Sequence, residues 1–224
     1  MSESAVNESR IVSIDGTIGG GKSVLVADFH DYIKNNKIQG FCFLDEPVDE
    51  WNTIRDKHGV PILERYYEDQ PRYAFSFQMM AYISRLSLLR DALKNKENKV
   101  IITERSILTD KNVFAKMLYD DEKIEEIEYQ IYLKWFDEFI RDIPNISYVY
   151  LKTDAAVAKM RVDKRARAGE NIPLEYLEKC CTYHDNWLYN LKHGRLLQID
   201  GNVDINENPE VRKERAELIY RFTQ

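Results

Sequence analysis

A glycine-rich segment near the amino terminus has the residue types and spacing of a phosphate-binding loop. It runs from Gly16 to Ser23 and fits the pattern Gly-x-x-x-x-Gly-Lys-Ser. In such a loop, backbone N–H groups converge on phosphate oxygens, a lysine adds a point charge and a serine offers a hydroxyl ligand for Mg²⁺. We therefore expect a nucleoside triphosphate and Mg²⁺ to bind at Gly16, Thr17, Ile18, Gly19, Gly20, Gly21, Lys22 and Ser23.

Charged residues follow two further β-prone runs. Glu46 comes after residues 40–44 and precedes a proline, and Glu104 and Arg105 come after residues 100–103. A carboxylate beside a phosphate site can accept the proton of an attacking hydroxyl, and an arginine can stabilise the charge on the transferring phosphoryl group. A second carboxylate can lie near the metal. A surface carboxylate before a turn, and an ordinary ion pair in a loop, are the alternatives.

Three arginines gather near residue 165 of an otherwise acidic chain. Arg161 and Arg165 are four residues apart, on one face of a predicted helix, and Arg167 lies near its end. The cluster indicates a lid, about residues 162–172, that closes on the triphosphate with Gly169 as its hinge. A solvated helix end, where the helix dipole favours cations, would have the same composition.

Aromatic side chains are numerous and several lie near the charged residues. Singly, each is more often part of a hydrophobic core than a ligand contact. Together with the amide of Gln78 they could form a slot of the size of a nucleobase, apolar on its faces and hydrogen-bonding at its edge. The residues are Trp51, Tyr66, Tyr67, Phe77 and Phe114.

The elements that must position these residues alternate along the chain. Apolar runs predict strands at residues 11–15, 40–44, 100–103, 146–151 and 196–200. Helical spacing predicts helices at 22–34, 72–93, 123–141, 154–165, 173–192 and 209–222. This alternation predicts an α/β protein with the P-loop kinase fold: five mostly parallel strands, helices on both faces, and ligands at the carboxyl ends of the strands.

Composition limits the class of protein. The 224 residues suffice for a single domain, 1–224, and a net charge of −6 argues against nucleic-acid or membrane binding. Three cysteines without CxxC spacing, and no signal or transit pattern, predict reduced thiols and a cytoplasmic address.

The motifs together resemble the deoxyribonucleoside kinase family, in particular its deoxycytidine and deoxyguanosine kinases. The resemblance spans most of the chain. Five blocks carry it, in order: Gly16–Ser23, Glu46–Trp51, Phe77–Arg85, Glu104–Ser106, and Arg165 to Leu177. It implies transfer of the ATP γ-phosphate to the 5′-hydroxyl of a deoxyribonucleoside, in nucleotide salvage. It also implies a homodimer, for which the two long helices 72–93 and 123–141 are long enough.

The resemblance also implies roles for single residues. Glu46 would take the proton from the 5′-hydroxyl, and Glu104 would help Ser23 to hold Mg²⁺. The transferring phosphoryl group would be steadied by Lys22, Arg105, Arg161, Arg165 and Arg167. The nucleoside would be bound by Glu46, Trp51, Tyr67, Phe77, Gln78, Ala81, Arg105, Phe114 and, through its 3′-hydroxyl, Glu170.

Two residues bear on the choice of base. Arg85 lies about two helical turns after Gln78, and Asp110 lies six residues after Glu104. In the family, such a pair crowds the site against the thymine methyl, so thymidine should be a poor substrate. An ordinary ion pair is the alternative. Ala81 leaves space that suits cytosine or a purine without choosing between them.

The chain departs from the family pattern in two places, and other functions stay open. Gly19-Gly20 stand where many animal members have alanines, and the lid looks shorter, which leaves the alignment of Glu170 uncertain by one residue. A nucleoside-monophosphate kinase of the thymidylate type shares the phosphate loop but needs a second basic cluster. A nucleotide-sensing module would need no acceptor slot.

Overall fold

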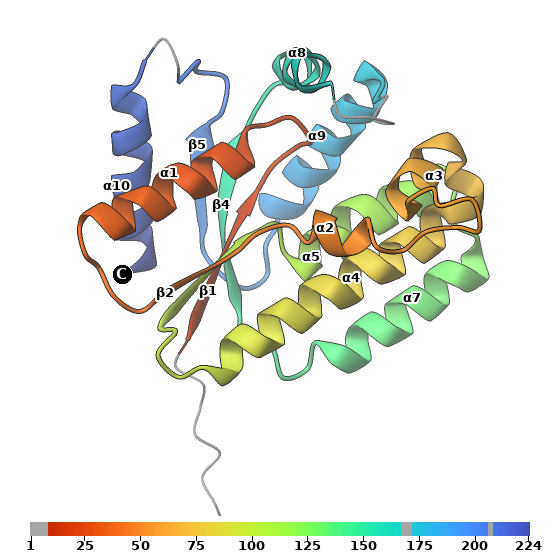
Figure 1. The fold of residues 1–224 in the computed structure, drawn as a ribbon, viewed down its shortest axis with the longest axis horizontal. Helices are drawn as coiled ribbons and strands as arrows, with labels where there is room; N and C mark the ends of the chain where they lie inside the picture. Colours follow the sequence, from red (N-terminus) through yellow and green to blue (C-terminus); the bar gives the residue numbers. More distant parts are fainter. Residues whose placement is uncertain (1–8, 167–171, 206–207) are drawn as a thin grey trace, which may run out of the picture.

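The computed structural model describes residues 9–166, 172–205 and 208–224, and these form a three-layered α/β structure (Figure 1). Its single sheet has five strands in the order β2-β3-β1-β4-β5, and every neighbouring pair is parallel. The strands are β1 (Arg10–Asp15), β2 (Phe41–Leu44), β3 (Val100–Glu104), β4 (Ile146–Lys152) and β5 (Leu196–Asp200). The sheet matches the P-loop kinase fold predicted for this chain.

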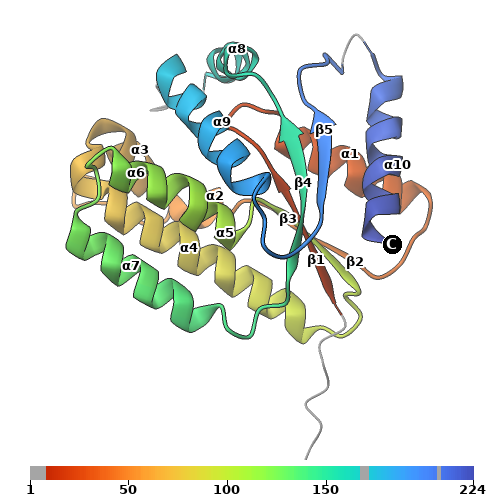
Figure 2. The same ribbon diagram turned by 180° about the vertical axis from the view of Figure 1, so that it is seen from behind.

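Helices cover both faces of the sheet, as the two opposite views show (Figures 1 and 2). One face is covered by α1 (Lys22–Asn35) and α10 (Glu210–Thr223). The other is covered by α4 (Gln70–Lys94), α7 (Glu126–Phe139) and α9 (Leu174–Leu188), with α8 (Ala155–Arg165) near the carboxyl ends of the strands. Because every neighbouring pair of strands is parallel, the carboxyl ends of all five strands lie on the same side of the sheet.

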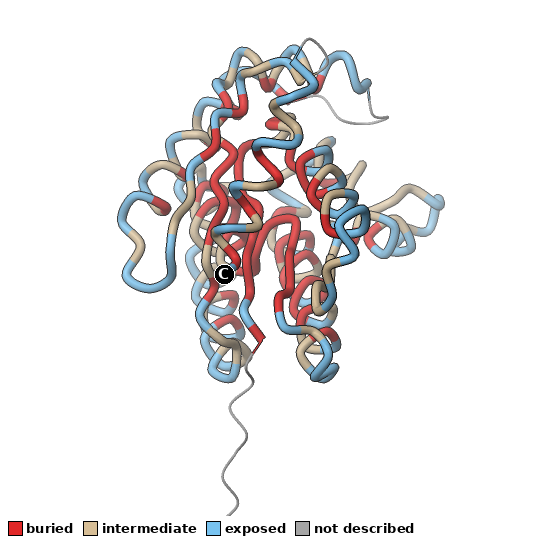
Figure 3. Tube along the Cα trace, turned by 90° about the vertical axis from the view of Figure 1, so that its left-hand side faces the viewer, coloured by how far each residue is buried: buried red, intermediate tan, exposed pale blue. Residues whose placement is uncertain are grey.

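The core follows from the alternation of side chains along the strands. In β4, Tyr148 and Tyr150 face the α4 and α7 side, while Val149 and Leu151 face α1 and α10. The buried trace in Figure 3 accordingly runs through the centre of the molecule, with exposed residues on the outer helices. Because both faces are buried, the strands read as continuous apolar runs, as is usual for parallel sheets.

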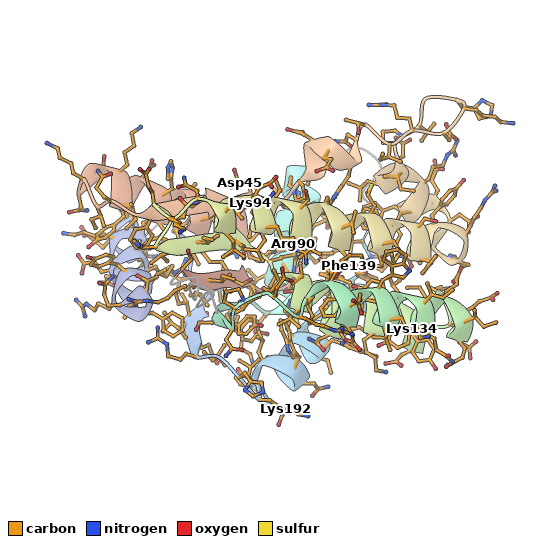
Figure 4. All side chains as sticks on the ribbon, turned by 90° about the horizontal axis from the view of Figure 1, so that it is seen from below. Asp45, Arg90, Lys94, Lys134, Phe139 and Lys192 are labelled. Carbon is orange, nitrogen blue, oxygen red and sulfur yellow. The ribbon has the colours of Figure 1, made fainter. Side chains whose placement is uncertain are left out.

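The two long helices α4 and α7 lie side by side (Figures 1 and 4). Near one end Arg90 donates to the Phe139 carbonyl at 2.9 Å and stands 5.8 Å from the Phe139 ring. Both residues are labelled in the view from below (Figure 4). Within the described chain, no helix is both long and apolar enough to span a bilayer.

The sequence predicted the long elements to within a few residues and missed the short ones. The helix expected at 123–141 is shorter, because its first turn begins at Glu126, where Glu125 and Glu128 form a capping box. The helix expected at 209–222 begins at Glu210, directly after Pro209. The missed elements are α2 (Val48–Trp51), α3 (Ile62–Glu68), α5 (Ile107–Thr109), the π-helix η1 (Asp110–Ala115) and α6 (Lys116–Asp120). Segments this short show no helical periodicity.

Candidate active site

A cavity of about 790 Å³ opens at the carboxyl ends of the strands. Its wall begins at the loop between β1 and α1 and continues to α3, α4 and η1. The cavity therefore joins the glycine-rich segment to the predicted aromatic slot, and one ligand-sized space reaches both.

The segment Gly16–Ser23 forms a turn that only glycine accommodates at several positions. Gly16, Gly19 and Gly21 have φ angles of 151°, 75° and 97°. A side chain at Gly16 would also approach the Leu151 carbonyl oxygen to 2.5 Å. The loop delivers the chain to the N-terminus of α1, where backbone N–H groups and the helix dipole attract anions.

Lys22 is buried at the base of this loop. Its Nζ donates to the Thr17 carbonyl at 2.9 Å, so the loop holds the ammonium group under the turn. Burial, with the nearby charge of Arg105, lowers the pKa of Lys22 to about 8. An arriving phosphate would stabilise the charged form.

Ser23 and Glu104 form an oxygen pair beside the loop. The Ser23 hydroxyl donates to Glu104 Oε1 at 3.0 Å, which joins the first turn of α1 to the end of β3. Hydroxyl and carboxylate oxygens are the ligands that Mg²⁺ prefers, and Mg²⁺ commonly takes only one or two protein ligands next to phosphates. The pair fits the metal site that the sequence predicted.

Glu46 lies between two arginines at the end of β2. Its Oε1 accepts from Arg85 Nη2 at 2.9 Å and stands 3.5 Å from Arg105 Nε. Burial alone would raise the pKa of Glu46, but the charges of Arg85, Arg105 and Lys22 outweigh it and lower the pKa to about 2. Glu46 is consequently ionised at neutral pH.

Arg105 is held in a strained backbone conformation directly after β3. Its φ angle of 64° is in the left-handed region, which is unfavourable for a residue with a side chain. The guanidinium is buried, donates to the Gly16 carbonyl at 2.8 Å and stands 4.8 Å from the Phe114 ring. Such strain often marks a residue with a functional constraint, and here it aims the arginine between the loop and Glu46.

Arg85 and Asp110 form a buried ion pair. Arg85 Nε donates to Asp110 Oδ2 at 3.0 Å, and Arg85 Nη1 donates to the Glu104 carbonyl at 2.9 Å. Burial raises the pKa of Asp110 to about 6, although the charge of Arg85 opposes that shift. Asp110 is the first residue of η1, which is a π-helix. Short π-helical turns often lie at functional sites.

The aromatic slot is assembled from α2, α3 and α4. The Phe77 ring is stacked against Tyr66 at 4.6 Å and meets Trp51 edge to face at 5.3 Å. Gln78 is buried in α4, and its Oε1 has no hydrogen-bond partner. Since a buried amide oxygen without a partner is costly, a polar ligand edge at this point would satisfy it. The cavity is also lined by Tyr67, Ala81 and Phe114.

The predicted lid arginines are partly described. Arg161 Nη1 donates to the carbonyls of Gly20, at 3.1 Å, and Gly201, at 2.9 Å, so it ties α8 to the phosphate loop and to the segment after β5. Arg165 is exposed and lines the cavity. Arg167, Glu170 and the expected hinge Gly169 lie outside the described residues.

The structure adds residues to which the sequence assigned no role. Tyr176 of α9 lines the cavity, and its hydroxyl lies 3.2 Å from that of Tyr66. Arg215 of α10 also lines it, and donates to the Asp200 carbonyl at 2.5 Å. Tyr176 falls inside a quoted sequence block, but only its contact with α3 distinguishes it from a core tyrosine. For Arg215 the sequence carried no signal.

Comparison with known proteins shows that this chain is similar to deoxynucleoside kinases. A family model described as deoxynucleoside kinase matches residues 12–224. The probable deoxycytidine kinase of fowlpox virus is 34% identical over 94% of this chain and 87% of its own. Human deoxycytidine kinase is 31% identical over 89% of this chain and 86% of its own. The mitochondrial deoxyguanosine kinase of Xenopus laevis is 28% identical over 94% and 88%.

Proposed function

The chain belongs to the deoxynucleoside kinase family of ATP-dependent phosphotransferases, and from this we propose that it phosphorylates the 5′-hydroxyl of a deoxyribonucleoside in nucleotide salvage. We propose further that deoxycytidine or a purine deoxynucleoside is favoured and thymidine is disfavoured. The observation that carries the proposal is the continuous cavity that joins the phosphate loop to Glu46 and to the unpartnered amide oxygen of Gln78.

Glu46 orients the attacking hydroxyl. It stands at the end of β2, on the cavity wall between the phosphate loop and the aromatic slot. A carboxylate with a pKa near 2 is a weak base, but the loose transition state of phosphoryl transfer requires little proton abstraction before the P–O bond breaks. Glu46 therefore accepts a hydrogen bond from the 5′-hydroxyl and receives its proton late in the reaction.

The phosphate side of the reaction depends on fixed positive charge. Lys22 and Arg105 flank the loop and are buried, so their interaction with developing charge is stronger than in water. Arg161 donates to the Gly20 carbonyl, and Arg165 lines the cavity, where it adds positive charge. Arg167, which lies outside the described residues, remains the third proposed arginine. The expected result is a transferring phosphoryl group steadied on several sides.

Mg²⁺ would be held by Ser23 and Glu104 together with the phosphates. Among the described residues, no group of three or more His, Cys, Asp or Glu could hold a metal alone, which supports a site shared with the triphosphate. When bound, the ion supplies positive charge to the phosphate oxygens. The protein contributes the orientation of the two oxygens through the 3.0 Å bond that already joins them.

The choice of base rests on Gln78, Arg85 and Asp110. A glutamine amide can donate to N3 and accept from N4 of cytosine, and the N1 and N6 edge of adenine offers the same pattern. The buried Arg85–Asp110 pair supports exclusion of thymidine, since both side chains line the cavity and are held in place by their ion pair at 3.0 Å. Trp51, Phe77 and Phe114 supply the apolar faces, and Tyr67 and Glu170 remain the proposed partners of the sugar 3′-hydroxyl.

A substrate panel tests the function. Steady-state rates with ATP and Mg²⁺ should be compared for deoxycytidine, deoxyguanosine, deoxyadenosine and thymidine, and for their 5′-monophosphates. We expect turnover of the nucleosides, with thymidine the poorest. Strong activity confined to a monophosphate would refute the proposal. ATP hydrolysis without phosphorylation of any of these acceptors would indicate a nucleotide-sensing module.

We also propose that the protein is a homodimer formed through α4 and α7. Large apolar side chains are exposed on these helices: Ile127 at 70%, Trp135 at 47%, Ile83 at 44% and Ile131 at 42%. Three of them, spaced four residues apart on α7, form a stripe along one face of the helix. Neighbouring apolar residues of this kind are typical of a protein interface.

A further inference from the structure

Ser84 is a buried serine on α4 whose hydroxyl is used twice. It accepts a hydrogen bond from the Trp51 indole Nε1 at 2.9 Å and donates to the Ala81 carbonyl at 3.1 Å. The bond to Ala81 fixes where the hydroxyl proton points, and this leaves a lone pair directed at the indole. The orientation of the Trp51 ring is thereby tied to the backbone of α4.

Helix α2, which carries Trp51, has little stability of its own. Helix α2 has four residues, a single turn, and no side chain caps its N-terminus. One helical turn does not persist in water without tertiary contacts. Its buried side chain is Trp51, which meets Phe77 edge to face and lies 5.6 Å from the Arg85 guanidinium.

Ser84 and Arg85 are adjacent in α4, and they contact the two ends of the segment Glu46–Trp51. Arg85 holds the Glu46 carboxylate, at 2.9 Å, where the segment begins. Ser84 holds Trp51, at 2.9 Å, where α2 ends. Inside the segment, the backbone N–H of Trp51 donates to the Pro47 carbonyl. Movement of the indole would therefore be transmitted to Pro47, the residue after Glu46.

We propose that Ser84 is a positioning residue of the acceptor pocket, which acts by fixing the Trp51 indole and, through α2, the segment that carries Glu46. The inference rests on the proposed acceptor site, because Trp51 is the wall against which the nucleoside binds. Ser84 itself does not line the cavity, and its effect is transmitted through the indole N–H.

The test compares Ser84→Ala with Ser87→Ala. Ser87 is one turn further along the same helix and is exposed, so its substitution removes a hydroxyl without touching the pocket. Loss of one buried hydrogen-bond acceptor should raise KM for deoxycytidine about tenfold. KM for ATP should stay unchanged, because the phosphate loop is not involved. Ser87→Ala should match the wild type in both constants.

A double-mutant cycle with Trp51→Phe separates positioning from general stability. Phenylalanine has no N–H to donate, so Ser84→Ala should add nothing to KM for deoxycytidine in that background. A tenfold effect in both backgrounds, or a lowered melting temperature with unchanged KM, would overturn the proposal. Because wild-type turnover of deoxynucleosides is measured first, failure of the proposed function is recognised separately.

Discussion

The four charged side chains at the centre of the cavity form one connected network. Glu46 contacts Arg85 and Arg105, and Arg85 contacts Asp110. Because the groups are largely buried, the charges of the two arginines act strongly on the pKa of Glu46 and Asp110, and removal of one partner leaves the others uncompensated. Changes of single residues here should therefore alter chemistry and specificity more than they alter the fold around the site.

Glu46→Gln should abolish nucleoside phosphorylation while ATP still binds. The amide keeps the shape of the side chain but cannot take the proton of the 5′-hydroxyl, so kcat should fall by about 10²–10⁴-fold. Rates on deoxycytidine and calorimetric binding of ATP measure the two effects. Glu50→Gln, an exposed carboxylate on α2, is the control and should retain full activity. Unimpaired turnover by Glu46→Gln would refute its role as base.

The lowered pKa of Lys22 predicts an alkaline limb in the use of ATP. Since the pKa is lowered to about 8 from the usual 10.5, the free enzyme loses this charge as pH rises through about 8. At saturating deoxycytidine, kcat/KM for ATP should then fall about tenfold per pH unit. At saturating ATP, kcat/KM for deoxycytidine should stay flat over the same range, because bound phosphate raises the pKa of Lys22. The same limb in both profiles would contradict this assignment.

Arg85→Met combined with Asp110→Ala should relax the exclusion of thymidine. Removing both members opens space beside Ala81 and removes both charges of the pair, while Glu46 keeps Arg105 as a partner at 3.5 Å. The ratio of kcat/KM for thymidine to that for deoxycytidine should rise at least about tenfold, a gain of roughly 1.4 kcal/mol. The matched control is Arg90→Met with Asp142→Ala, an ion pair of 2.8 Å between α4 and the segment after α7, which should leave the ratio unchanged. An unchanged ratio in the first variant would count against the crowding account.

At the scale of the element, the β1 to α1 loop depends on backbone conformation. Gly16 has a φ of 151° and stands against the Leu151 carbonyl, whereas Gly20 has no positive φ. A side chain therefore conflicts with the fold at Gly16, while at Gly20 its nearest neighbour, the Thr17 carbonyl oxygen, would be 3.0 Å away. The two glycines differ in what they contribute to the cradle.

Gly16→Ala should weaken ATP binding far more than Gly20→Ala. The Cβ at residue 16 would lie 2.5 Å from the Leu151 oxygen, so the loop must shift and lose the convergence of its N–H groups. KM for ATP should rise by more than about tenfold in Gly16→Ala, since a misplacement near 1 Å can cost that much or more. Gly20→Ala should remain close to wild type. Equal effects of the two substitutions would show that the loop adapts its backbone.

At the scale of the whole molecule, the proposed dimer should be visible in the molecular mass in solution and should depend on the exposed face of α7. Light scattering should give about 53 kDa, twice the 26.5 kDa of the chain. Trp135→Glu, in the exposed stripe of α7, should yield monomers because a charge would be buried in the interface. Leu218→Glu on α10 is a matched control, since Leu218 is 45% exposed and lies on the far side of the sheet. A wild-type monomer would overturn the proposal.

The sequence by itself determined the parts that are local in the chain. The phosphate loop was predicted because its chemistry resides in eight consecutive residues, and the parallel sheet was predicted because buried strands and helices have different periods. Glu46, Glu104 and Arg105 could be placed at one edge because parallel strands carry their carboxyl ends to the same side. The family resemblance then supplied roles for Gln78, Arg85 and Asp110.

Only the tertiary structure decided what depends on residues distant in sequence. Ser84 reaches Trp51 across 33 residues, and Arg161 reaches Gly20 across 141. The pKa of about 2 at Glu46 arises because the fold gathers Arg85, Arg105 and Lys22 around it, and their charges outweigh the effect of burial. The left-handed backbone of Arg105 occurs together with its side-chain bond to the Gly16 carbonyl and its contact with the Phe114 ring. Such effects follow from side chains brought together by the fold, and no local pattern in the sequence encodes them.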